Sequence, residues 1–286
     1  MSATAETLRL PAGTLGAQAA PRDHAVDARW LMAYAAALGE MDPRYFDTTI
    51  ASGPLAHPLF PVCYEWPVAL ELRERVLGAA VAGRSVHATH DLVIHRPPRA
   101  GDVLRTRARI AEVRAVKAGS LVVMELETVD GGGAPVTTTR YGSIYRGVRC
   151  DAGAPVSSTP PPTAAPSVTR WQEQVEVGAR LAHVYTECAR IWNPIHTDLG
   201  AARAAGLPGL ILHGTATLAL AVSRVVTRDL GGEPFRVRAV AVRFTGMVPL
   251  PSLLTVRGLD GGPTDIRFDA VDAAGHPVLD RGVVRR

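Results

Sequence analysis

The sequence is poor in lysine, in cysteine and in runs of like charge. Of its 31 basic residues only Lys117 is a lysine, so lysine chemistry is excluded everywhere else. The arginines are scattered singly or in pairs and build no basic arm, which argues against a lysine-rich nucleic-acid patch. The three cysteines (Cys63, Cys150 and Cys188) are odd in number and form no CxxC pair. They therefore indicate neither a disulfide framework nor a thiolate zinc site.

Signals of targeting and of several enzyme classes are also missing. The N-terminus lacks a basic region followed by an apolar core, so no secretory signal is visible. The longest uncharged stretch, residues 204–223, contains glycine, proline and histidine, and favours a loop before a buried helix over a membrane span. No Gly-rich phosphate loop, HExxH or GxSxG motif occurs, which argues against nucleotide-binding, zinc-peptidase and serine-hydrolase classes. We expect a cytoplasmic protein with no nucleic-acid partner.

The length of 286 residues allows one large domain or two small ones. Residues 1–20 are small, polar and patternless, and predict a leader that packs weakly. Residues 151–168 are rich in proline, serine and alanine, which is typical of a semi-rigid linker. This composition predicts an N-terminal domain at residues 21–150 and a C-terminal domain at residues 169–286.

The two halves carry a faint internal repeat at a shift of 151 positions. Residues 34–47 (YAAALGEMDPRYFD) align with residues 185–198 (YTECARIWNPIHTD), with three identical positions. Each segment leads through a loop with glycine or proline into an apolar helix, expected at residues 64–77 and 215–227. The second of these helices is apolar almost all round, so it must be buried on nearly every side.

Runs rich in valine, isoleucine and threonine follow each helix and predict four strands in each half. They lie at residues 86–95, 103–116, 120–129 and 136–148, and at residues 236–244, 253–259, 266–272 and 278–284. A sheet that curls around one buried helix hides both the helix and one face of the sheet. The predicted fold is therefore α+β, with two antiparallel sheets that each wrap a long buried helix.

The segment with the most chemical content runs from Asn193 to Gly214. A following proline holds Asn193 in extended geometry, and Asp198 is placed to cap a short helix at residues 199–205. His196 then lies on a tight loop at a helix start. Gly214 precedes the buried helix, so its backbone N–H is unpaired at the positive end of the helix dipole. Such an N–H beside a histidine suits polarisation of a thioester carbonyl with proton transfer next to it.

The series NPIH, AGLP and ILHG resembles the MaoC-like (R)-specific enoyl-CoA hydratases and dehydratases of the tandem hot-dog type. The resemblance covers most of the chain and makes the first half a degenerate hot-dog domain. It implies a lyase that adds or removes water across the 2,3-double bond of an acyl thioester, with catalytic roles for His196 and Gly214. The substrate would be an acyl-CoA or an acyl carrier protein. No other cofactor is expected, because CoA or phosphopantetheine enters as part of the substrate.

The chain departs from the family pattern at the acid that lies five residues before the histidine. That position is Ile191, which cannot exchange a proton. The first half has the reverse pattern, with Glu40 at the equivalent position and a tyrosine in place of the histidine. Candidate replacement acids are Glu187, on the strand expected to enter the motif, Asp198, and Glu40 across the pseudo-twofold axis. Alternatively His196 works alone, the substrate supplies the group, or hydratase activity is lost.

Three neighbours of the motif are candidate substrate-binding residues. Asn193 braces the loop. Arg190 is either a ligand for a carboxylate or CoA phosphate or a solvated residue at a strand end. His213 either packs beside Gly214 or contacts the substrate.

Three further histidines share one predicted strand. The odd spacing from His90 to His95 places His87, His90 and His95 on opposite faces, so we expect no metal site. Two functions other than hydration stay open: cyclisation, isomerisation or thioester hydrolysis on the same scaffold, or a non-catalytic acyl-binding subunit. A homodimer or a companion hot-dog subunit is compatible with the sequence.

Overall fold

The computed structural model describes residues 8–51, 53–150 and 168–286. The predicted linker, except for its last position, and the first seven residues of the predicted leader lie outside the described residues. The elements of the first half are β1 (Arg22–Ala25), α1 (Ala28–Ala37), α2 (Pro61–Ala82), β2 (Ser85–Ile94), β3 (Val103–Val116), β4 (Gly119–Val129) and β5 (Pro135–Arg146). Those of the second half are β6 (Thr169–Val177), α3 (Leu181–Ala189), α4 (Leu199–Ala204), α5 (Gly214–Asp229), β7 (Ala239–Phe244), β8 (Ser252–Leu259), β9 (Asp265–Val271) and β10 (Pro277–Arg285).

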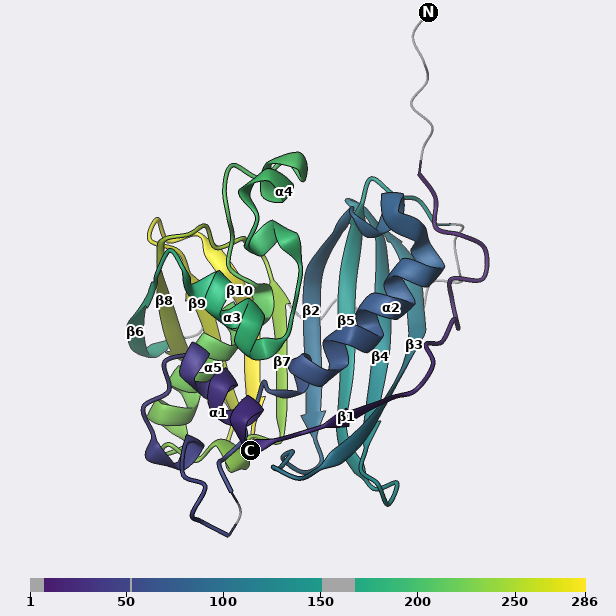
Figure 1. Cartoon of the computed structure of the whole chain (residues 1–286). Helices are drawn as coiled ribbons and strands as arrows, with labels where there is room; N and C mark the ends of the chain where they lie inside the picture. The colour runs from purple at the N-terminus through teal and green to yellow at the C-terminus, as the bar shows by residue number, and fades with distance from the viewer. Residues whose placement is uncertain (1–7, 52, 151–167) are drawn as a thin grey trace, which may run out of the picture.

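The strands join into one sheet with the order β1-β3-β4-β5-β2-β7-β10-β9-β8-β6. The pair β2 and β7 is antiparallel and connects the two halves, and on either side of it the strands follow in the same mirrored order. Helix α2 lies across the strands of the first half, and α5 contacts β8, β9 and β10 of the second (Figure 1). The expected α+β architecture of two hot-dog units is confirmed, with the two sheets fused into one.

The local sequence explains these elements. Strand β3 alternates buried and exposed side chains, because Leu104, Thr106 and Ala108 point inward while the arginines between them point outward. Helix α5 carries no charge until Arg224 and is buried along most of its length. All eight predicted strands and both predicted long helices are confirmed, with ends shifted by at most five residues.

The two copies of the repeat meet on a pseudo-twofold axis. Helices α1 and α3 pack against each other. The hydroxyl oxygens of Tyr34 and Tyr185, which are equivalent under the shift of 151, lie 3.4 Å apart in the interior. The Tyr34 hydroxyl also donates to the carbonyl of Leu59 at 3.2 Å. Equivalent residues therefore touch each other at the centre of the molecule.

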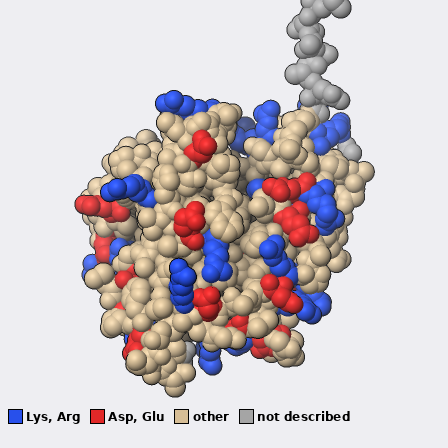
Figure 2. Space-filling model, viewed as in Figure 1, with Lys and Arg blue, Asp and Glu red and all other residues tan. Residues whose placement is uncertain are grey.

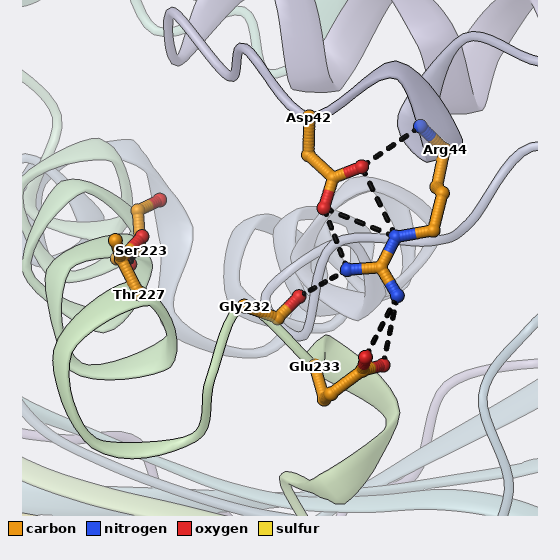
Figure 3. Close-up of polar contacts among 6 residues, drawn as sticks. All are labelled: Asp42, Arg44, Ser223, Thr227, Gly232 and Glu233. Atoms are coloured by element: carbon orange, nitrogen blue, oxygen red, sulfur yellow. Dashed lines mark hydrogen bonds and ion pairs between the residues drawn. The ribbon is translucent and has the colours of Figure 1, made fainter.

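A guanidinium group ties the first half to the second. Arg44 contacts both carboxylate oxygens of Glu233 at 2.9 Å, donates to the Gly232 carbonyl at 2.7 Å and pairs with Asp42 at 2.6 Å (Figure 3). Its side chain is 38% exposed. Solvent therefore screens these ion pairs, and each contributes at most about 1 kcal/mol.

The expectation of a weakly packed leader is wrong for its described part. Leu10 and Ala19 are buried against the core of the first half. The backbone N–H groups of Leu10, Gly16 and Ala19 donate to Arg149, Ile110 and Ala108.

Two properties of the whole chain follow from the described residues. Acidic and basic side chains alternate over the face seen in Figure 2, with no large area of one sign. Within residues 8–51, 53–150 and 168–286, no helix has both the length and the apolar character needed to cross a membrane.

Candidate active site

A cavity of about 820 Å³ takes in the segment that the sequence singles out. The second half supplies Asn193, His196, His213 and Gly214 to its wall. The first half supplies side chains from α2, β2, β4 and β5. Both hot-dog units therefore share one cavity.

His196 lies at the end of a short 3-10 turn, Pro194–His196, and its side chain is held on two sides. Its Nδ1 donates to the carbonyl of Ile211 at 2.9 Å, so Nε2 is the ring nitrogen left for a ligand. The ring stacks on His213 with 3.7 Å between ring centroids. Burial lowers the pKa of His196 to about 4, which keeps the ring neutral at physiological pH.

His213 and Gly214 form the start of α5. His213 is the residue before the first turn, and its Nε2 lies 3.1 Å from the Thr186 hydroxyl. Burial lowers its pKa well below the ordinary value, so it is neutral as well. Among the described residues, no backbone carbonyl accepts from the Gly214 N–H. This free donor at the positive end of a 16-residue helix favours a partial negative charge.

His87, from the first half, lies beside the start of α5. A Cβ added to Gly214 would stand 3.8 Å from its Nδ1. The ring stacks on Tyr141 and lies against Phe244, with centroids 4.0 and 4.3 Å away. Its Nε2 is 3.1 Å from the Thr89 carbonyl, so Nε2 carries the proton and Nδ1 keeps a lone pair.

Regular alternation along β2 would place His87 and His90, three residues apart, on opposite faces, and the structure departs from it. The register between β2 and β5 shifts between His87 and Thr89, which is a β-bulge. The bulge puts His87 and His90 on the same face, with ring centroids 5.5 Å apart. His95 instead lies beyond the strand, where its Nε2 contacts the Thr138 hydroxyl. Across the described parts of the chain, no group of three or more His, Cys, Asp or Glu side chains is arranged to hold a metal ion.

Glu40 does not reach His196. Its Oε1 accepts a hydrogen bond from Ser223 on α5, and it lies 3.6 Å from Nε2 of His57. Burial raises the pKa of this carboxyl. The expected pairing of Glu40 with His196 does not occur: across the pseudo-twofold axis Glu40 meets Ser223, and His57 is its neighbour within the first half.

The other two candidate acids also lie away from the histidine. Asp198 caps α4, as the sequence predicts, and accepts from the Ala201 N–H at 2.9 Å. Glu187 lies on helix α3, and the expectation of a strand there is wrong. Its side chain lines a separate surface hollow with Trp192. In the described structure none of the three carboxylates is hydrogen-bonded to His196.

Of the two other predicted binding residues, Asn193 lines the cavity, where it lies at the entrance to the histidine loop. Arg190 instead ends α3 in the left-handed conformation, with φ of 58°, and its guanidinium stacks 4.0 Å above the Trp30 ring. This cation–π contact holds the two halves together and occupies the face of the guanidinium.

Glu65 is a functional candidate that the sequence analysis did not identify. It lies on α2, is 4% exposed and lines the cavity. Its Oε1 accepts from the hydroxyls of Thr139 at 2.7 Å and Thr137 at 3.4 Å. Burial raises its pKa to about 7. The signal was present, because an acidic residue three positions after Val62 falls on the buried stripe of the helix.

Comparisons with known proteins assign both halves. Residues 170–278 match the model of the MaoC like domain, and residues 14–139 match that of the FAS1-like, dehydratase domain region. A segment of 76 residues is 46% identical to fatty acid synthase subunit beta of Aspergillus oryzae. A segment of 71 residues is 37% identical to peroxisomal enoyl-CoA hydratase 2 of Arabidopsis thaliana. These segments cover 26% and 24% of the chain but only 4% and 23% of the two relatives.

The whole fold has a close counterpart among solved structures. A MaoC-like dehydratase from Phytophthora capsici superposes with a TM-score of 0.82 at 22% identity. The match covers 95% of this chain and 96% of that one. At this identity the likeness establishes the fold, and the geometry of the cavity must carry the chemistry.

Proposed function

Since this chain belongs to the MaoC-like dehydratase family and folds as a double hot dog, we propose that it hydrates or dehydrates an acyl thioester. The bond concerned is the 2,3-double bond of an acyl-CoA or of an acyl group on a carrier protein. One observation carries the proposal: a neutral histidine and a free helix N-terminal N–H lie in one cavity.

His196 is the proposed proton carrier. In hydration, its Nε2 takes a proton from water while the water oxygen bonds to C3 of the enoyl group. The electrons of the double bond move toward the thioester oxygen, and the Gly214 N–H with the α5 dipole stabilises that charge. The proton then passes from His196 to C2, which completes a 3-hydroxyacyl thioester. Dehydration is the same sequence reversed.

His87 is the proposed second group, in place of the missing acid. Ile191 is 3% exposed and apolar, and in the described structure no carboxylate is bonded to His196. Of the three atoms nearest to a Cβ placed on Gly214, the His87 Nδ1 is the one polar atom. It can accept a hydrogen bond from the attacking water and hold it beside C3. The roles of the family's acid would then be divided between two neutral histidines.

A second candidate function is acyl-thioester binding without chemistry. The buried Ile191 at the acid position favours it, because the pairing that the resemblance implies is absent. Binding of saturated and unsaturated acyl-CoA with equal affinity and no turnover would support this function.

The test measures loss of the conjugated enoyl absorbance with crotonyl-CoA, longer enoyl-CoAs and the corresponding carrier-protein thioesters. Removal of a proton carrier costs typically 10²- to 10⁴-fold, so His196→Ala should lower kcat/KM by about that factor. His87→Ala should lower it by at least about tenfold. His276→Ala is the matched control, because that side chain is 77% exposed and is not part of the cavity wall. A His196→Ala variant as active as wild type would refute the assignment. No turnover by wild type on the whole panel would favour the binding function.

A further inference from the structure

The cavity extends beyond the proposed catalytic groups into the first half, between α2 and the sheet. Val62, Ala69 and Leu126 give this part an apolar wall. The side chains of Glu65, Arg73 and His90 interrupt that wall, and the Arg73 guanidinium lies over the Trp66 ring. Their presence is unexpected for a pocket that takes a plain alkyl chain, because a buried polar atom without a partner is unfavourable.

His90 is the clearest case. Its side chain is 1% exposed and lines the cavity, and neither Nδ1 nor Nε2 has a hydrogen-bond partner in the described structure. Burial lowers its pKa to about 4, so the ring is neutral and offers one donor and one acceptor. The rings of His87 and Tyr141 flank it in edge-to-face contacts, and neither ring forms a hydrogen bond with it.

Glu65 adds a further unused oxygen. Both hydrogen bonds that the carboxyl receives, from Thr139 and Thr137, go to Oε1, and Oε2 receives none from the described residues. With a pKa near 7 the group is partly protonated at neutral pH, so Oε2 can donate as well as accept. A second fixed negative charge on a ligand would be unfavourable beside it.

The register of the sheet gives the depth of these groups. His87, which lies next to Gly214, pairs with Ser143 on β5, and His90 pairs with Tyr141. Glu65 bonds to Thr139, four residues along β5 from Ser143. At a rise of about 3.3 Å per residue, the polar groups lie roughly 7 to 13 Å along the sheet from the proposed thioester position.

A pair of arginines lies at another end of the cavity. Arg84 and Arg146 line it where it reaches the surface, and both are exposed. Neither forms a salt bridge within the described part of the chain. Arginines there suit the phosphate groups of CoA or phosphopantetheine. The polar groups on α2 and β2 are therefore left for the far part of the acyl chain.

We propose that the acyl group taken by this cavity carries a hydroxyl group on its chain, bound by His90 and Glu65. This inference rests on the proposed acyl-thioester function. A hydroxyl both donates and accepts, so it can satisfy the donor and the acceptor of a neutral histidine site together with a carboxyl oxygen. A ketone only accepts, and an alkyl chain leaves His90 and Glu65 unpaired. Sites built to hydrogen-bond a substrate hydroxyl discriminate strongly against analogues that lack it.

The experiment measures binding by calorimetry, so it requires no turnover. The probes are decanoyl-CoA, isomers of hydroxydecanoyl-CoA with the hydroxyl near the middle or the end of the chain, and the corresponding oxo compounds. We expect wild type to bind at least one hydroxy isomer about tenfold or more tightly than decanoyl-CoA. The hydroxy isomer should also bind more tightly than its oxo counterpart.

Variants assign the preference to residues. His90→Leu should abolish it, and Glu65→Gln, which keeps the shape of the side chain, should reduce it. His95→Leu is the matched control, because that histidine follows the same strand but lies outside the cavity. Circular dichroism and thermal melts identify any variant that fails to fold, and the wild-type comparison alone still decides the proposal.

Two results would overturn the inference: equal affinity of wild type for decanoyl-CoA and every hydroxy isomer, or a preference that survives in a folded His90→Leu variant. Equal affinity would mean that water, and not a ligand hydroxyl, occupies the part of the cavity beside His90 and Glu65. Crotonyl-CoA is too short to reach His90, so its turnover by wild type reports on the proposed function separately. Turnover without a hydroxyl preference would reject only this inference.

Discussion

His57 makes the fold sensitive to acid in a way that one substitution can isolate. Its ring is 1% exposed and lies between the two halves, with Nε2 3.1 Å from the Ser223 hydroxyl. Its Nδ1 accepts from the Leu59 N–H at 3.0 Å, so Nε2 carries the proton of the neutral ring. Burial lowers the pKa of His57 to about 3. Protonation therefore opposes folding.

The magnitude follows from linkage. A histidine whose pKa is near 6.5 when unfolded and about 3 when folded binds more protons in the unfolded state between those values. The free energy of unfolding is then constant above about pH 6.5 and falls as the pH drops toward 3. At about 1.36 kcal/mol per pH unit, His57 removes roughly 2 kcal/mol between about pH 7.5 and pH 5. Glu40, 3.6 Å away, titrates in the opposite sense because burial raises its pKa, so this figure is an upper bound.

The assay is urea unfolding at the two pH values, for wild type and for His57→Asn. Asparagine can keep the acceptor for the Leu59 N–H but does not titrate. The loss of unfolding free energy between the two pH values should be smaller in the variant by about 2 kcal/mol. Leu59→Val is the control, since it should lower stability by about 1 kcal/mol at both pH values alike. An unchanged pH difference in His57→Asn would refute the reasoning.

Three further substitutions test the cavity. Gly214→Ala places a methyl group 3.3 Å from the Phe244 ring and 3.8 Å from the His87 Nδ1, between the two proposed catalytic elements. It should lower enoyl-CoA turnover at least about tenfold while melting temperature stays level or rises, since alanine favours helix. Ile191→Asp should raise the pKa of His196 from about 4 by roughly 1 to 3 units. The acid limb of the pH–rate profile should then move to higher pH, and the variant should lose several kcal/mol of unfolding free energy because it buries a carboxyl group. Ile191→Asn should leave the acid limb at its wild-type pH. Ala69→Leu should lower kcat/KM for decenoyl-CoA far more than for crotonyl-CoA, and equal effects would contradict the assigned path of the acyl chain.

The sequence predicted the architecture well because the fold depends on local periodicity and on a repeat. The alternation in residues 103–116 reappears as β3 with the same ends. The capping role of Asp198 was predictable for the same reason, since it needs only the residues that follow. Features that depend only on residues close together in the chain can therefore be predicted from the sequence with little error.

Contacts between the halves were not predictable, because they depend on register and on three-dimensional neighbours. One inserted residue in β2 moves every side chain before it to the opposite face of the strand, and this bulge brings His87 to the site. The sequence alone does not show where such a bulge occurs. Arg190 was open between a ligand and a solvated residue, and it stacks on Trp30, 160 positions earlier in the chain. Such pairings are set by the meeting of α1 and α3 at the pseudo-twofold axis.

The cavity itself follows from how the two copies of the long helix have diverged. Where α5 has Leu220, buried at 4%, α2 has the much smaller Ala69 at the equivalent position. Helix α2 also contains Pro67 and a kink at Gly78, whose φ is 69°, whereas α5 has neither. A smaller side chain and a broken helix pack less fully against the sheet, which leaves room along α2. The second half has His196 and Gly214, and the first half, which has Tyr45 and Cys63 at the equivalent positions, contributes the part of the cavity that runs along α2.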